Sequence, residues 1–355
     1  MSIIWMGIFV LCNAVVIGNG SGLNCTRESC KLDDESIRFF VIGDWGGETK
    51  KPYTTQGQQL CADLISEMGK VKKPHFFVST GDNFYESGVE DVSDPRFKET
   101  FDDVFIYGKA EKVPWYVTQG NHDWYGNASA QVAYTWVNDR WVSPNYSFKV
   151  AYDARPSGPS IHMIFLDTVV LCGNTGKDSE DETNHHKGPH DPTAAKKMWA
   201  WVEEEMAASN ADYLFLVGHF PLFASDSHNI SDCLVPRLQD LIEQYNASGY
   251  LAGHSHNLQH VKTISRLTGR PIHHILSGAG HLTNANFKPV FSDLKSNPWR
   301  VTSEFFFPQR KKHSSKEQKD DGGLVYIQLG AREGTVEYYR CDGDRLYGFE
   351  VQVRA

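Results

Sequence analysis

Five short apolar segments of the chain are each followed by a glycine and then by a side chain that can bind a metal ion. These pairs are Gly43-Asp44, Gly81-Asp82, Gly120-Asn121, Gly218-His219 and Gly253-His254. One such pair is common in proteins, but five at the ends of predicted strands would rarely arise by chance. Glycine lets the backbone turn sharply at the end of a strand, so these side chains are expected to converge at one edge of a sheet.

The candidate ligands are oxygen and imidazole donors, without a thiolate. They are Asp44, Asp82, Tyr85, Asn121, His219, His254 and His256. This set suits Fe, Mn or Zn. Seven ligands are too many for one ion, so we expect two ions that share a bridging carboxylate, which we assign to Asp82. Tyr85 would bind one of them as a phenolate, a hard donor that favours Fe(III). Taken alone, Asp82 would more often be a turn or helix-capping residue, so the metal interpretation depends on the whole set.

Apolar runs rich in Val, Ile, Phe and Tyr predict strands buried on both faces, which helices or a second sheet must cover. The predicted strands are Ile37–Ile42, His75–Ser79, Val113–Thr118, Ile161–Leu166, Tyr213–Val217, Tyr250–Ala252, Ile272–Leu276 and Leu324–Leu329, with an antiparallel pair at Thr335–Arg340 and Arg345–Val353. Helices are predicted over Gln56–Lys70, Pro95–Phe101, Ala195–Met206 and Val235–Tyr245. Two polar stretches, Gly173–Asp191 and Lys288–Asp321, are expected to be long loops.

The composition fits a secreted globular protein. The 355 residues carry a formal charge of -9 without a basic stripe, which argues against a nucleic-acid partner. Residues 1–20 resemble a cleaved signal peptide, because Ile3–Ile17 is apolar and small residues follow; a membrane anchor is the alternative. The remaining residues, 21–355, are expected to form a single catalytic domain without a membrane span.

Two further features agree with secretion. Six Asn-X-Ser/Thr triplets begin at Asn19, Asn24, Asn127, Asn145, Asn229 and Asn246, and we expect glycans on some of them. Six cysteines follow the predicted signal peptide, at Cys25, Cys30, Cys61, Cys172, Cys233 and Cys341. An even number favours disulfides, although spacing alone leaves fifteen pairings open.

The five strand ends that carry a glycine and a candidate ligand, in this order along the chain, resemble the motifs of the metallophosphoesterase superfamily. Tyr85, placed after Gly-Asp-Asn-Phe, narrows the resemblance to the tartrate-resistant (type 5) purple acid phosphatases, from about Ile37 to at least Gly280. The resemblance implies an α/β (α+β) fold with two packed mixed β-sheets flanked by helices. It implies that Fe(III) is held by Asp44, Asp82, Tyr85 and His256. A second ion, Fe(II) or else Zn or Mn, would be held by Asp82, Asn121, His219 and His254.

The resemblance also implies an activity: hydrolysis of phosphate monoesters, as small molecules or on phosphoproteins, by direct attack of metal-bound hydroxide. His122 and His228 match histidines that face the substrate, and Cys172 and Cys233 match a disulfide pair of the family. We expect a monomer that is secreted or lysosomal. The alternatives are a Zn/Mn phosphodiesterase or phosphoprotein phosphatase of the same superfamily, and a secreted glycoprotein that does no chemistry.

The sequence also departs from the family pattern. Ser255 stands between two ligands where mammalian relatives have Asp, and the stretch Gly173–Asp191 differs from their protease-sensitive loop, so proteolytic activation is not carried over. Asn229 is next to His228, and we expect it to be unmodified or to point away from the site. The remaining histidines of interest, His75, His273, His274 and His281, match no ligand position.

Overall fold

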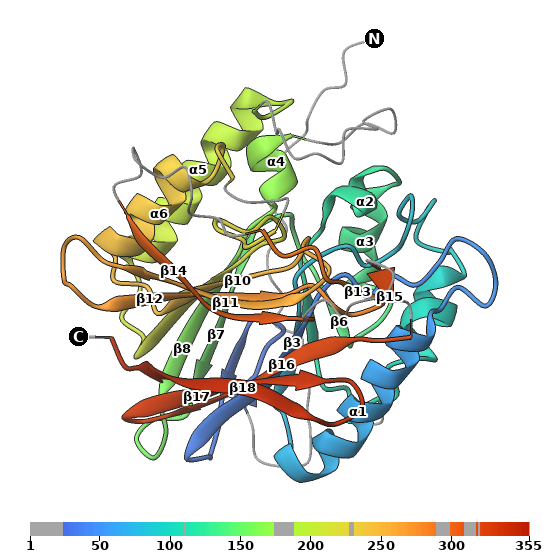
Figure 1. The fold of residues 1–355 in the computed structure, drawn as a ribbon, viewed down its shortest axis with the longest axis horizontal. Coiled ribbons are helices and arrows are strands. Elements are labelled where there is room, and N and C mark those ends of the chain that lie inside the picture. The colour runs from blue at the N-terminus through green and yellow to red at the C-terminus, as the bar shows by residue number, and fades with distance from the viewer. Residues whose placement is uncertain are drawn as a thin grey trace.

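The computed structural model describes residues 24–109, 111–173, 188–226, 231–288, 299–308, 317–318 and 320–354. Within them, two large β-sheets pack face to face and helices cover the outer face of each (Figure 1). This confirms the predicted sandwich of two mixed sheets flanked by helices. The expected signal peptide, residues 1–20, lies outside the described residues.

The first sheet has seven strands. Their order is β18 (Arg345–Gln352), β17 (Glu333–Arg340), β16 (Gly323–Gly330), β3 (Ser36–Ile42), β4 (Phe76–Ser79), β5 (Trp115–Val117) and β6 (Trp141–Val142). Strands β3 to β6 run parallel to one another, whereas β16, β17 and β18 pair antiparallel. The carboxyl ends of β3, β4 and β5 therefore meet at one edge of the sheet.

The second sheet has nine strands. Their order is β1 (Asn24–Cys25), β2 (Ser29–Lys31), β7 (Phe148–Asp153), β8 (Ser160–Phe165), β9 (Tyr213–Val217), β10 (Gly249–Ala252), β12 (Pro271–Ser277), β11 (Leu258–Ile264) and β14 (Arg300–Phe307). Its centre, from β8 through β9 and β10 to β12, is parallel. A separate two-stranded sheet joins β13 (Thr283–Asn284) to β15 (Glu317–Gln318).

Helices form the two outer layers. They are α1 (Gln56–Lys72), the π-helix η1 (Phe97–Asp102), α2 (Asn121–Trp124), α3 (Ala128–Tyr134), α4 (Thr168–Cys172), α5 (Pro192–Ala207) and α6 (Val235–Gln244). Helix α1 packs on the seven-stranded sheet, while α4, α5 and α6 cover the nine-stranded sheet (Figure 1). Side-chain caps fix where three of the helices begin: Thr55 accepts a hydrogen bond from the N–H of Gln58, Asp167 caps α4, and Asp191 caps α5.

The main core lies between the two sheets and is rich in aromatic side chains. Phe39 and Phe76, on adjacent strands, stack with their ring centroids 4.7 Å apart, and both are fully buried. Across the core, Phe76 also contacts Tyr152 of β7, with centroids 4.6 Å apart. Each such side chain contributes roughly 1.5–3 kcal/mol by burial. The core thus fixes the strand ends from which the candidate ligands project.

Every predicted strand is confirmed to within a few residues, but the predictions for two other segments need correction, and three strands were missed. Pro95–Phe101, predicted as a helix, is a short π-helix shifted to Phe97–Asp102. The stretch Lys288–Asp321 is not wholly a loop, because β14 lies within it. Strand β14 was missed because it is an edge strand whose first five residues are mostly polar and exposed. Strands β7 and β11 were missed because charged or polar residues interrupt their apolar runs.

The described residues contain three disulfides. Cys172 is joined to Cys233, as the family resemblance implied. The pairing of the other cysteines, which the sequence left open, is Cys61 to Cys341 and Cys25 to Cys30. In the described part of the chain, no helix has the length and apolar character needed to cross a membrane.

Candidate metal centre

The predicted ligands converge from both sheets. Asp44 follows β3, Asp82 follows β4, and Asn121 begins α2 shortly after β5. His219 follows β9 and His254 follows β10 of the other sheet. Because these strand ends point the same way, five separate turns bring their side chains into one buried site.

The turns of this site combine a strained backbone with close approach of neighbouring segments. Asp44, Asp82 and His254 all adopt a left-handed backbone, with φ of 57°, 53° and 68°. Such values are uncommon for residues other than glycine and concentrate at functional sites. The glycine at 120 is required by close approach, since a Cβ there would lie 2.1 Å from Oδ1 of Asp82. Gly120 thus avoids a clash with a ligand, and so does Gly253, where a Cβ would lie 2.4 Å from Oδ2 of Asp44.

The first cluster surrounds the phenol oxygen of Tyr85. This oxygen lies 3.0 Å from Oδ1 of Asp44, 3.0 Å from Oδ2 of Asp82 and 2.9 Å from Nε2 of His256. Asp44, Asp82 and Tyr85 are buried, and His256 is half-buried. A phenol has one proton, so it cannot donate to all of these acceptors at once. Four donor atoms this close to one another suit a cation among them.

The second cluster surrounds His219. Its Nδ1 donates to the carbonyl of Thr80 at 2.8 Å, which leaves Nε2 to face Oδ1 of Asn121 at 3.0 Å and Oδ2 of Asp82 at 3.4 Å. A neutral Nε2 would point its lone pair at two acceptors, so the arrangement requires either a second proton or a cation. Histidines that bind a metal through one ring nitrogen typically donate a hydrogen bond from the other nitrogen to a carbonyl or carboxylate, as His219 does to Thr80.

Asp82 connects the two clusters. One ligand atom each from Asp82, His219 and His254 lie within 4.8 Å of one another, and the same holds for Asp44, Asp82 and His256. These spacings are what two ions with a shared carboxylate need, since ligand atoms about 2.0–2.2 Å from an ion lie a few ångströms apart. All seven predicted ligands thus lie in these two clusters.

The buried charges of the site perturb one another. Burial raises the pKa of Asp44 well above its usual range, and the neighbouring charge of Asp82 adds to this effect. Burial opposes a charged imidazole at His219, yet the carboxylate of Asp82 raises its pKa to about 9. The carboxylates of the site thus favour a positive charge at His219, and a metal cation at this position would supply that charge. This supports the fit of the site to a metal ion.

His122 borders the centre without belonging to either cluster. Its backbone N–H donates to Oδ1 of Asp82 at 3.0 Å, and its Nδ1 donates to the carbonyl of Glu86 at 2.7 Å. The second bond fixes the ring and leaves Nε2 as the atom available for proton transfer. The ring centroid lies 4.7 Å from that of Tyr85. The other predicted catalytic residue, His228, lies outside the described residues.

Buried polar residues hold the ligand loops in place. Asp123 accepts hydrogen bonds from the backbone N–H groups of Asn83, Phe84 and Gly120, which ties the loop after β4 to the start of α2. Trp45, next to the ligand Asp44, is a packing residue: it is fully buried, and its Nε1 donates to Oγ of Ser79.

The sequence analysis missed one residue of the site. His281 matched no ligand position, but its Nδ1 donates to the carbonyl of Asp44 at 2.6 Å and its ring lies 4.3 Å from that of Tyr85. The chain carried a signal for it, because Gly280-His281 follows β12 much as Gly218-His219 follows β9. His281 supports the loop of Asp44 and packs against Tyr85.

Comparisons with known proteins identify the family. The family model described as calcineurin-like phosphoesterase matches residues 37–258, more than half of the chain. Tartrate-resistant acid phosphatase type 5 of Homo sapiens is 33% identical over 321 residues, covering 90% of this chain and 92% of the relative. The Oryctolagus cuniculus protein of the same name is 34% identical with the same coverage. The chain is a tartrate-resistant (type 5) purple acid phosphatase by family. It is therefore an acid phosphatase with a metal centre.

More distant relatives agree with this. Purple acid phosphatase 4 of Arabidopsis thaliana is 27% identical, covering 90% of this chain and 84% of the relative. Among solved structures, "GAP50 the anchor in the inner membrane complex of Plasmodium" has a TM-score of 0.69 at 23% identity, covering 91% of this chain and 90% of that one. Purple acid phosphatase PPD1 of yellow lupin has a TM-score of 0.56 at 15% identity, covering 89% and 54%. At these identities the two structures support the fold alone.

Proposed function

We propose that this member of the type 5 purple acid phosphatases hydrolyses phosphate monoesters at a dinuclear centre of Fe(III) and a divalent ion, Fe(II) or else Zn or Mn. The observation that carries the proposal is the placement of the Tyr85 oxygen within 3.0 Å of Asp44 and Asp82 and 2.9 Å from His256. A phenolate among carboxylates is a hard ligand set that suits a trivalent ion.

The donor sets divide between the two ions. Fe(III) would be held by Asp44, Asp82, Tyr85 and His256, and the divalent ion by Asp82, Asn121, His219 and His254. When bound, such a pair neutralises the charge of a phosphate ester, lowers the pKa of water and aligns attack with departure of the leaving group. The chain's part is to hold each donor fixed, which the hydrogen bonds of His219 to Thr80 and of His254 to Asp44 achieve.

His122 is our candidate for the general acid. With Nδ1 held by the Glu86 carbonyl, a protonated His122 presents its Nε2 proton to the oxygen of the leaving alcohol. Its backbone contact with Asp82 keeps it beside the bridging carboxylate. His228 remains the second candidate from the sequence. The proposed substrates are small phosphate monoesters or phosphoproteins.

The fold alone does not settle catalysis, because an anchor protein shares it. The complete donor set favours an enzyme over a secreted glycoprotein without activity. Tyr85 favours an iron centre over a Zn/Mn phosphodiesterase or phosphoprotein phosphatase, since a redox-inert pair has no need of a phenolate. The deciding assay is hydrolysis of 4-nitrophenyl phosphate at pH 5 before and after removal of metal with a chelator. Activity that survives complete metal removal contradicts the proposal.

We also propose where the protein is located in the cell or outside it. Three disulfides fit an oxidising compartment, and the family includes lysosomal and secreted acid phosphatases by the resemblance given above. We infer that residues 1–20 are removed as a signal peptide and that residues 21–355 form one secreted or lysosomal catalytic domain, acting as a monomer. Amino-terminal sequencing of the secreted protein tests the cleavage.

A further inference from the structure

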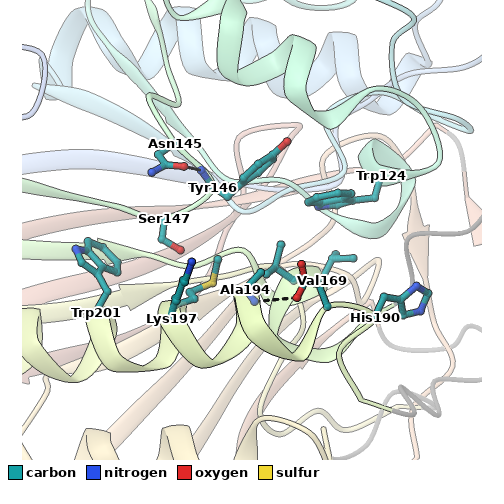
Figure 2. Close-up of a pocket in the computed structure, with 12 residues that line it drawn as sticks. Trp124, Asn145, Tyr146, Ser147, Val169, His190, Ala194, Lys197 and Trp201 are labelled. Atoms are coloured by element: carbon teal, nitrogen blue, oxygen red, sulfur yellow. Dashed lines mark hydrogen bonds between the residues drawn. The ribbon is translucent and has the colours of Figure 1, made fainter. Parts of the chain in front are cut away.

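A cavity of about 680 Å³ lies between residues 145–147, which precede β7, and helices α4 and α5; Figure 2 shows the side chains that line it. Trp124 and Tyr146 form one wall, with ring centroids 5.1 Å apart, and Met198 and Trp201 of α5 contribute to the other. The cavity offers aromatic faces and few charges. Aromatic walls of this kind bind ring-shaped ligands with apolar faces, including sugars.

Ser147, which also lines this cavity, has a hydroxyl that the fold does not use. Its Oγ is buried and makes no hydrogen bond within the described part of the chain. A buried hydroxyl without a partner costs about 1–3 kcal/mol and calls for an explanation. Ser147 is the third residue of the triplet Asn145-Tyr146-Ser147, which is a glycosylation signal. Ser147 thus belongs to a glycosylation signal, and its hydroxyl makes no hydrogen bond within the described residues.

Asn145 is poised for that modification. It is exposed, and its Oδ1 accepts a hydrogen bond from the N–H of Tyr146 at 2.8 Å. Within the described residues no hydrogen bond involves its Nδ2, the atom to which a glycan is attached. Its side chain borders the same cavity.

Two other signals with described side chains differ from this one. Asn127 uses its Nδ2 to donate to the carbonyl of Glu90 at 3.1 Å. Asn246 is half-buried in a left-handed turn, and Ser248 of its triplet is buried with its Oγ accepting from the N–H of Leu214. In both, groups of the triplet take part in the folded structure.

We propose that Asn145 carries an N-linked glycan whose first sugar lies in this cavity. One face of the sugar ring packs on Tyr146 and Trp124, the aromatic wall next to Asn145. The sugar thereby covers an apolar surface that would otherwise face water. The inference rests on the secretory route and does not depend on the phosphatase chemistry.

The test uses the full-length protein secreted from a eukaryotic host. Glycopeptide mass spectrometry should find the Asn145 peptide modified in the wild type and in Ser147→Thr, which keeps the signal, and unmodified in Asn145→Gln and Ser147→Ala. A second measurement tests the packing. Hydroxyl-radical labelling of Met198 and Trp201 should rise at least twofold in Asn145→Gln, while exposed Trp136 stays unchanged as an internal control.

Enzymatic trimming separates the sugar in the cavity from the rest of the glycan. Protein trimmed to one sugar on each asparagine should keep the low labelling of the wild type. Complete removal of the glycans should reproduce the Asn145→Gln result. An unmodified Asn145 peptide in secreted protein overturns the proposal, and so does a modified Asn145 whose removal leaves the labelling of Met198 and Trp201 unchanged.

Discussion

The phenol oxygen of Tyr85 lies 2.9 Å from Nε2 of His256, although 171 residues separate them in the chain. The contact joins a turn of the seven-stranded sheet to a turn of the nine-stranded sheet. Neither sheet holds a complete ligand set, so the centre exists only when the two sheets are packed together.

Tyr85→Phe should abolish the purple colour, because the charge transfer that gives this colour needs a phenolate on Fe(III). The phenyl ring keeps the contacts with His122 and His281, so the fold should be retained. The visible spectrum of the metal-loaded variant tests this, with circular dichroism as the control for folding. Colour of undiminished intensity would show that Tyr85 is not a ligand.

Asp82→Asn should lose metal and activity together. Asp82 belongs to both clusters, so its replacement weakens both sites at once. Activity should fall by more than about 100-fold, since even residues that only support a ligand change activity 10- to 100-fold. Metal analysis of the purified variant is the measurement. Two ions per chain with full activity would contradict the bridging role.

His122→Ala should keep both metals but lower turnover, by about 100-fold or more on an alkyl phosphate. The loss should be smaller on 4-nitrophenyl phosphate, whose leaving group needs less help from an acid. Comparing kcat for the two substrates tests the assignment. Equal losses on both substrates, or wild-type rates on the alkyl phosphate, would remove His122 from the role of acid.

Gly120→Ala should reduce metal content without unfolding the chain, because the new Cβ would displace the carboxylate of Asp82. Gly269→Ala is the control: nothing lies within 4 Å of its Cβ, and only a left-handed backbone opposes it. The control should cost about 1 kcal/mol of stability and no metal. Equal metal content in the two variants would refute the steric argument.

Two buried histidines away from the metal centre, His273 and His274 of β12, should make the stability of the fold decrease in acid. Burial lowers the pKa of His274 to about 3 and that of His273 to about 4, against 6.5 in the unfolded chain. The folded state therefore excludes protons that the unfolded state binds. Stability is full above pH 6.5 and declines as pH falls toward these lower values.

The size of this effect can be measured residue by residue. Between pH 6.5 and pH 5, each of the two histidines accounts for a loss of up to about 2 kcal/mol. Urea unfolding at both pH values, for the wild type and His274→Gln, tests it. The variant should show a shallower decline. An identical decline in the two proteins would exclude His274 as a source.

Much of the site followed from the sequence because its signals are local. A glycine before a polar residue at a strand end marks a sharp turn, and Asp82 and His219 both follow that rule. Contacts between residues that are far apart in the sequence leave no such local signal. The contact of Tyr85 with His256 and the disulfide of Cys61 with Cys341 depend on long-range packing that spacing alone does not encode.

The misses have physical causes of the same kind. Strand β14 escaped prediction because its first five residues are mostly polar and its apolar part, Phe305–Phe307, is too short to predict a strand; pairing with β11 makes it a strand. His281 escaped because its role is to bond the Asp44 carbonyl, a contact between segments 237 residues apart. Side chains defined by tertiary contacts are the ones that a local pattern cannot assign.

The most direct test of the dinuclear centre is the metal content of the purified secreted protein, measured with its visible spectrum. We predict two metal ions per chain, at least one of them iron, and a purple absorption that disappears in Tyr85→Phe. A colourless protein that is free of iron, zinc and manganese, yet hydrolyses phosphate esters at full rate, would contradict the account.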